Sequence, residues 1–112
     1  MMHTIDLAKD FSEFPFGRRS PEDGEFSGAK FRDSILKPII EKLQDGDKIN
    51  VDLNGVPVGI GSSFLSESFG GVVTKGYLTK EKFLDALIIT CDDDLYEEEI
   101  VEYINESEAE VA

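Results

Sequence analysis

Three stretches of the chain have the apolar spacing of β-strands. In residues 3–8, apolar and polar side chains alternate with a period of two, which predicts an edge strand. Residues 48–53 place Ile49, Val51 and Leu53 on one face and polar side chains on the other. Residues 86–91 form a continuous apolar run, typical of a strand covered on both sides, so we expect this strand at the centre of the sheet.

Helical periodicity fills the regions between and after these strands. Ser27 is a candidate N-cap for a helix with an apolar stripe, in which Pro38 should cause a bend or a restart near Lys37. A second helix should begin at Ser62 and Ser63, after a glycine-bearing turn that covers residues 54–63. A short helical turn is expected at 79–84, and Asp94 with Glu97 resembles a capping box that opens a last helix.

The order of these elements predicts the fold class. A helix-bearing connection between strands 48–53 and 86–91 implies a right-handed crossover and parallel pairing. The prediction is a small α/β fold, with a mixed or mostly parallel sheet flanked by helices. We expect a single domain over residues 1–112, with a core at about 3–105 and a polar C-terminal tail at 106–112.

One long segment, residues 9–25, has neither helical nor strand periodicity. It contains three phenylalanines, two prolines and two glycines. We predict an ordered loop pinned by aromatic side chains, and its role stays open.

The candidate site is the turn between strand 48–53 and the helix that follows. In parallel sheets ligands favour the carboxyl ends of strands, and a helix N-terminus has unpaired N–H donors and partial positive charge. Four residues could therefore cradle an anion or form a phosphorylation switch: Gly59, Gly61, Ser62 and Ser63. The simpler interpretation is that Ser62 or Ser63 caps the helix. The lysine and the spacing of a nucleotide-binding P-loop are absent from this motif.

Charge narrows the range of partners. Eleven basic residues against 24 acidic ones give a formal net charge of −13, which opposes direct contact with nucleic acid or an anionic membrane and leaves basic protein partners open. The chain has one cysteine. Its sequence shows neither the pattern of a secretory leader nor an apolar run long enough to span a membrane. We therefore expect a soluble, cytoplasmic protein whose oligomeric state the sequence leaves open.

The other candidate residues point less clearly to chemistry. The acidic run at 92–94 and 97–99 could attract a cation, but a solvated helix start explains it better. Cys91 and His3 fit packing or exposure better than catalysis. Three arginines could bind a phosphate or pair with nearby acids: Arg18, Arg19 and Arg32. We find no nucleophile, base and oxyanion set, and we expect no enzymatic activity, cofactor or metal.

Residues 17–73 resemble the STAS-like domains of unknown function, which are relatives of the anti-sigma-factor antagonists. The matching positions are Gly17-Arg18, Asp23-Gly24, Ser27-Gly28, Phe31-Arg32, Leu36, Pro38, Val51-Asp52-Leu53, Gly55-Val56, Gly61-Ser62-Ser63-Phe64-Leu65, Glu67 and Phe69-Gly70-Gly71. The resemblance implies an antagonist-like arrangement of sheet and helices. In better understood relatives a partner kinase phosphorylates a serine that opens the corresponding helix. Ser62 or Ser63 holds that place here, but Gly61 replaces the acidic residue that precedes it in those relatives.

Three function classes remain. The first, implied mainly by the resemblance, is a non-enzymatic protein-interaction and regulatory module with a phosphoserine switch and a histidine-kinase-like ATPase as its partner. Its predicted partner surface includes Asn54, Phe64, Ser66 and Glu67. The second is a small-molecule, nucleotide or anion-binding domain that uses the same helix N-terminus. The third is an acidic mimic that binds a nucleic-acid-binding protein.

Overall fold

The computed structural model describes residues 1–20, 22–57 and 59–110. Pro21 of the predicted loop, Val58 of the predicted turn and the last two residues of the predicted tail lie outside this description. The strands are β1 (Met2–Asp6), β2 (Lys48–Asp52) and β3 (Leu87–Thr90), in the order β1-β2-β3. Both neighbouring pairs are parallel, with Ile5 opposite Val51 and Val51 opposite Ile89. The predicted α/β class and the parallel pairing are confirmed.

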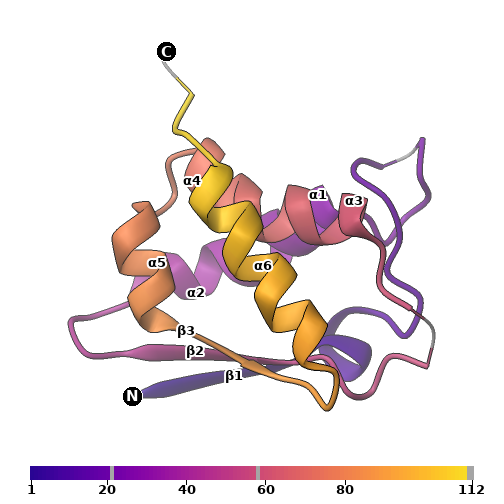
Figure 1. Ribbon diagram of the computed structural model, residues 1–112, viewed down its shortest axis with the longest axis horizontal. Coiled ribbons are helices and arrows are strands. Elements are labelled where there is room, and N and C mark those ends of the chain that lie inside the picture. The colour runs from indigo at the N-terminus through magenta and orange to yellow at the C-terminus, as the bar shows by residue number, and fades with distance from the viewer. Residues whose placement is uncertain (21, 58, 111–112) are drawn as a thin grey trace.

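The sheet is covered on one face only. Figure 1 shows the helices above the sheet and the three strands beneath them. Ile5, Ile49 and Val51 are buried under the helices, whereas Met2 and Ile88 on the opposite face are 53% and 38% exposed. The prediction that residues 86–91 form the central strand, covered on both sides, is therefore wrong. β2 is central, and β3 is an edge strand whose apolar side chains are only partly buried.

The first helical region after the N-terminal loop runs from residue 28 to 42. It comprises α1 (Gly28–Phe31), the π-helical turn η2 (Arg32–Leu36) and α2 (Lys37–Lys42). Ser27 caps it as predicted, since its Oγ accepts the Lys30 amide. Pro38 lies in the first turn of α2, directly after the π-helical turn, as one of the two predicted alternatives has it. Leu36 and Lys37 keep right-handed helical dihedrals, so the helix continues through this junction and does not restart.

The second helical region runs from residue 62 to 74. It comprises α3 (Ser62–Leu65), the π-helical turn η3 (Ser66–Gly70) and α4 (Gly71–Thr74). Most of its residues from Phe64 to Val73 are buried. Two close approaches require glycine: a Cβ on Gly28 of α1 would lie 2.7 Å from the Phe64 carbonyl oxygen, and a Cβ on Gly71 would lie 2.6 Å from Nη1 of Arg32. The backbones of the two helical regions are therefore close together at Gly28, and at Gly71 the Arg32 side chain packs directly on the backbone.

The remaining helices are the π-helical turn η1 (Leu7–Phe11), α5 (Lys80–Ala86) and α6 (Asp94–Glu106). The helical turn predicted at 79–84 is the helix α5, which begins one residue later, at Lys80, with Thr79 as its N-cap. The predicted capping box at Asp94 is wrong by one residue, because Asp93 is the N-cap and its Oδ1 accepts the Leu95 amide. α6 runs diagonally across the helical layer, and its polar end leads into the C-terminal tail (Figure 1).

An aromatic row holds the core together. Phe31 lies 5.3 Å from Phe11, 5.8 Å from Phe64 and 6.1 Å from Phe69, measured between ring centroids. Phe11 therefore fixes the start of the predicted loop, and Phe26 packs on it at 5.5 Å. The expectation of aromatic pinning holds at Phe11, whereas the other two phenylalanines of the predicted loop are mostly exposed, Phe14 at 64% and Phe16 at 68%.

Candidate functional site

The predicted site turn lies where the sequence placed it, after the carboxyl end of β2. Gly61 is the N-cap of α3, and Ser62 is the first helical residue. Gly59, Gly61 and Ser62 are exposed, and Ser63 is half-buried. Among the described residues no side chain makes a capping hydrogen bond at this helix start, so the prediction that Ser62 or Ser63 caps the helix is wrong. Its physical reason is that the serines stand inside the first turn, one and two positions after the cap.

Two contacts from the start of the last helix hold this turn in place. Asn54 Oδ1 accepts the Asp92 amide at 2.8 Å, and the Tyr96 hydroxyl oxygen accepts the Ile60 amide at 3.0 Å. Ile60 is itself buried, with 7% of its surface exposed. Asn54 and Ile60 are thus anchored to the start of the last helix, and we call the exposed residues Asn54, Gly59, Gly61 and Ser62 the serine corner.

The predicted partner surface is only partly at the surface. Asn54 is exposed and Ser66 is half-buried, but Phe64 is fully buried against Phe31. The Glu67 side chain is only 15% exposed and bonds to Arg32. The prediction is therefore wrong for Phe64 and Glu67, because the side of α3 and η3 that carries these two residues faces α1 and η2. Ser66 stays a prediction.

The surroundings of the serine corner are acidic. The Tyr103 hydroxyl donates to Glu99 Oε2 at 3.4 Å, and burial together with the Glu99 charge raises the pKa of Tyr103, while a hydrogen bond with Ser62 acts in the opposite direction. Asp92, joined to Asn54, is followed by two further aspartates. The electrostatic field at this helix start therefore opposes a bound anion, although the helix dipole favours one.

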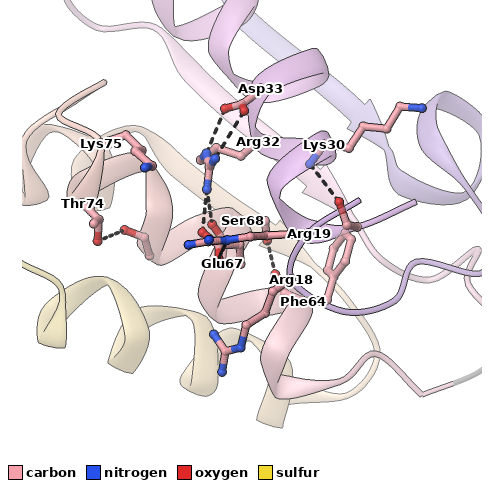
Figure 2. A network of polar contacts seen from close by, with 12 residues as sticks. Arg18, Arg19, Lys30, Arg32, Asp33, Phe64, Glu67, Ser68, Thr74 and Lys75 are labelled. Atoms are coloured by element: carbon pink, nitrogen blue, oxygen red, sulfur yellow. Dashed lines mark hydrogen bonds and ion pairs between the residues drawn. The ribbon is translucent and has the colours of Figure 1, made fainter. Parts of the chain in front are cut away.

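Arg19 and Arg32, two of the arginines that the sequence offered as phosphate ligands or as partners of acids, lie in a different cluster of basic side chains. Lys30 and Lys75 join them there, which the sequence did not indicate. A cleft of about 380 Å³ opens between the loop before α1, the α1–η2 helix and the end of α4. We call it the cationic cleft; its lining residues are Arg19, Ser20, Ser27, Ala29, Lys30, Arg32, Asp33, Glu67 and Lys75. Figure 2 shows Arg19 and Arg32 next to Glu67, with Lys75 to one side, each on a different element.

Arg32 forms the floor of this cleft and is 4% exposed. Its Nη1 donates to Glu67 Oε2 at 2.7 Å and to the Glu67 carbonyl oxygen at 3.1 Å, while its Nε donates to Asp33 Oδ1 at 2.9 Å (Figure 2). Burial alone would lower the pKa of Arg32, but the hydrogen bonds and charges of Asp33 and Glu67 outweigh it and raise that pKa. Arg32 is therefore a permanent cation.

Asp33 at the floor is held ionised in turn. Burial acts to raise the pKa of Asp33, yet hydrogen bonds from Arg32 and from the Tyr77 hydroxyl lower it overall. At the loop, the Asp23 carboxylate accepts the amides of Arg18 and Arg19, which lowers the pKa of Asp23. The predicted local pairing of these two arginines with acids thus goes through their backbone amides.

The remaining candidates of the sequence take ordinary structural positions. Cys91 is half-buried beside the core, and His3 Nε2 lies 3.2 Å from Asp47 Oδ2. Within the described ranges no group of three or more His, Cys, Asp or Glu side chains is placed to hold a metal ion. No helix formed by the described residues combines the length and the apolar character needed to cross a membrane.

Comparison with known proteins gives one match. The family model described as a STAS-like domain of unknown function matches residues 27–96. No curated protein and no solved structure matches this chain. The matched segment includes α1, the serine corner, the helix 62–74, β3 and the Arg32–Glu67 pair, and it covers more than half of the chain. The chain belongs to the STAS-like domains of unknown function.

Proposed function

We propose that the protein is a non-enzymatic regulatory module that binds a protein partner through the serine corner. The observation that carries this proposal is the position of Ser62, which is exposed at the start of a helix that is otherwise mostly buried. The contacts of Asn54 and Tyr96 keep that end of the helix ordered without a partner. A preformed, exposed corner loses little conformational entropy when a partner docks on it.

Phosphorylation of Ser62 is the switch in this proposal. Transfer of the γ-phosphoryl group of ATP by a partner kinase would form an Oγ–P bond at Ser62 and release ADP, adding roughly −1.5 to −2 charges. The helix dipole favours that charge, but the Glu99 carboxylate, which bonds to Tyr103 next to Ser62, opposes it. The modified corner would therefore repel an acidic partner surface and rearrange its contact with α6.

The family match supports the general setting of this proposal. The partner suggested by the better understood relatives is a histidine-kinase-like ATPase, in the cytoplasm. Of the two serines, Ser62 is the better substrate, because Ser63 is half-buried.

The test compares affinity purification of three forms of the chain from the native cell, with mass spectrometry reading both partners and phosphorylation. The forms are the wild type, Ser62→Asp and the matched control Ser34→Asp, which changes an exposed serine of η2. We expect one specific partner to be retained by wild type and control and lost by Ser62→Asp. A partner retained equally by all three forms, or wild-type protein without a specific partner, contradicts the proposal.

A second candidate function is acidic mimicry, and α6 supplies the observation that favours it. α6 has six carboxylates and no basic residue, and several lie along one exposed stripe: Asp94, Glu97, Glu98, Glu102 and Glu106. Such a stripe suits the basic groove of a nucleic-acid-binding protein. Binding by mimicry should weaken steeply with salt and lose affinity gradually as these carboxylates are neutralised one by one. Loss of all binding through Ser62→Asp alone would favour the serine corner instead.

A further inference from the structure

The cationic cleft gathers basic side chains in a strongly acidic protein. Arg19, Arg32 and Lys75 come from the N-terminal loop, η2 and the end of α4, so three separate elements bring positive charge to one place (Figure 2). Lys30 lies at the rim, where its Nζ is 5.6 Å from the centre of the Phe26 ring. With the lining acids Asp33 and Glu67, the formal charge of the lining is four positive and two negative.

The cations at the mouth are held only loosely. Arg19 Nε lies 3.8 Å from Glu67 Oε1, and its side chain is 72% exposed. Lys75 Nζ lies 3.7 Å from Glu110 Oε2, with side chains that are 38% and 60% exposed. Exposed ion pairs of this length contribute little stability, so both cations can turn to an incoming anion at small cost. Arg32 is different, because its short bonds to both lining acids fix the floor.

The shape and lining of the cleft define the ligand class. A volume of about 380 Å³ is at the small end for ligand sites. Among the described residues the lining contains no aromatic side chain and one apolar residue, Ala29, so these residues offer no platform for a nucleobase. Ser20 and Ser27 bond within the protein, because their hydroxyl oxygens are 3.1 Å apart and Ser20 Oγ also donates to the Glu25 carbonyl oxygen at 3.1 Å. The lysine and arginine side chains of the lining are the usual partners of a phosphoryl group.

The start of α1 is not the anion site here. Its first amides already donate within the protein: Gly28 to Gly17, Ala29 to Arg18, and Lys30 to the Ser27 hydroxyl. Any anion in this cleft would therefore be held by side chains.

We propose that the cationic cleft is a binding site for the phosphoryl group of a compact, non-aromatic small molecule such as a sugar phosphate. Arg19 and Lys75 contact the phosphoryl oxygens, and Arg32 offsets one of the two negative charges of Glu67 and Asp33, which reduces the repulsion of the ligand by these acids. The partly exposed Asp33 carboxylate, 49% accessible, accepts hydrogen bonds from ligand hydroxyls. This site is separate from the serine corner and does not depend on the function proposed there.

The full chain is titrated in turn with inorganic phosphate, ribose 5-phosphate and ATP. Calorimetry and the NMR shifts of the arginine and lysine side chains measure the binding. The cleft variant is Arg19→Ala with Lys75→Ala. The matched control is Lys42→Ala with Lys82→Ala, which removes two exposed lysines of α2 and α5 outside the cleft. A third variant, Glu67→Gln, removes one negative charge and keeps an oxygen acceptor for Arg32. Circular dichroism checks that each variant is folded.

We expect ribose 5-phosphate to bind saturably and ATP to bind no more tightly than ribose 5-phosphate. The affinity for ribose 5-phosphate should be about tenfold weaker in the cleft variant and unchanged in the control. In Glu67→Gln it should be about threefold tighter. Inorganic phosphate should bind the same side chains, which separates the phosphoryl contribution from the sugar contribution. Three outcomes overturn the proposal: no saturable binding of any probe, equal weakening in cleft variant and control, or weaker binding in Glu67→Gln.

Discussion

Arg32 Nη1 and Glu67 Oε2 lie 2.7 Å apart, 35 positions apart in the chain, and join the two helical regions at the floor of the cationic cleft. Arg32 is 4% exposed and the Glu67 side chain 15%. Removing Arg32 leaves the Glu67 carboxylate without its partner and with little access to solvent. We expect Arg32→Met to lower the free energy of unfolding by about 2–3 kcal/mol, because the Glu67 carboxylate loses its partner. The loss should not be larger, because Asp33 remains half exposed and can regain water. Denaturant unfolding measures this change.

The double variant Arg32→Met with Glu67→Leu is the control for that experiment. It removes the stranded charge together with its partner, so it should be more stable than Arg32→Met alone. A double variant whose loss equals the sum of the two single losses would show that the pair is not coupled.

Gly28 lies where α1 crosses α3, and this crossing can be tested by adding one methyl group. A Cβ at Gly28 would meet the Phe64 carbonyl oxygen at 2.7 Å and the Gly17 carbonyl oxygen at 3.2 Å, neither of which is the end of a flexible side chain. Gly28→Ala should therefore destabilise the protein by about 2–3 kcal/mol, despite the better helix propensity of alanine. Thermal unfolding gives the measurement.

Gly61→Ala is the matched control, since a Cβ at Gly61 would meet no atom within 4 Å and its φ of −74° suits any residue. Its change should stay within about 0.5 kcal/mol, because lower entropy of the unfolded chain offsets the poorer N-cap. Equal losses in the two variants would contradict the close crossing.

The periodic parts of the fold could be predicted, and non-local contacts account for most of the rest. Alternation located the buried face of β2, and the N-cap preference located Ser27. The error on β3 has a clear cause: an apolar run predicts burial but does not say on which side cover exists. Here Ile88 reaches the open face of the sheet and is 38% exposed.

The candidate site divides in the same way. Ser62 was located because a glycine turn before an apolar stripe is a local signal. Glu67 was taken for a surface residue because its partner, Arg32, is 35 positions away and leaves no mark in local periodicity. The sequence held one hint, Gly70-Gly71, because glycines in a helix allow close packing, but nothing in it identifies the guanidinium of Arg32 as the neighbour of Gly71.

Tyr96 provides a test of the order in the serine corner. Its hydroxyl accepts the Ile60 amide, and Ile60 is buried, so Tyr96→Phe should leave that amide without an acceptor and cost about 1–2 kcal/mol. Hydrogen exchange at Ile60 should become faster. Tyr103→Phe is the control, because its hydroxyl contacts Glu99 at 3.4 Å and the exposed Ser62 but, among the described residues, no buried backbone amide, so its loss should cost less than about 0.5 kcal/mol. Unchanged exchange in Tyr96→Phe would show that this bond does not hold the turn.

Asp47 links the start of the chain to the loop before β2 and predicts a specific pH dependence. Hydrogen bonds from the N-terminal ammonium, the Gln44 amide and His3 lower the pKa of Asp47 from 3.8 to about 2. Since the folded pKa is below the unfolded value, the stabilisation is complete above pH 4 and disappears as the pH falls through about 2. Asp47→Asn should therefore be less stable than wild type near neutral pH, and the difference should shrink between pH 4 and pH 2. A difference that does not change with pH would contradict this assignment.

Ser62 and Glu99 should be electrostatically coupled through their shared neighbour Tyr103, and a double-mutant cycle measures this. In Ser62→Asp the new carboxylate gains about 0.3–1 kcal/mol from the helix dipole but is repelled by Glu99. In a Glu99→Gln background that repulsion is gone, so Ser62→Asp should become more favourable by about 0.5 kcal/mol at low salt, and the coupling should fade as salt is added. Ser34→Asp, on η2, should show no coupling to Glu99→Gln. If the coupling energy between Ser62→Asp and Glu99→Gln is zero at low salt, a phosphate on Ser62 would not act on α6. Any switch would then have to operate through the partner alone.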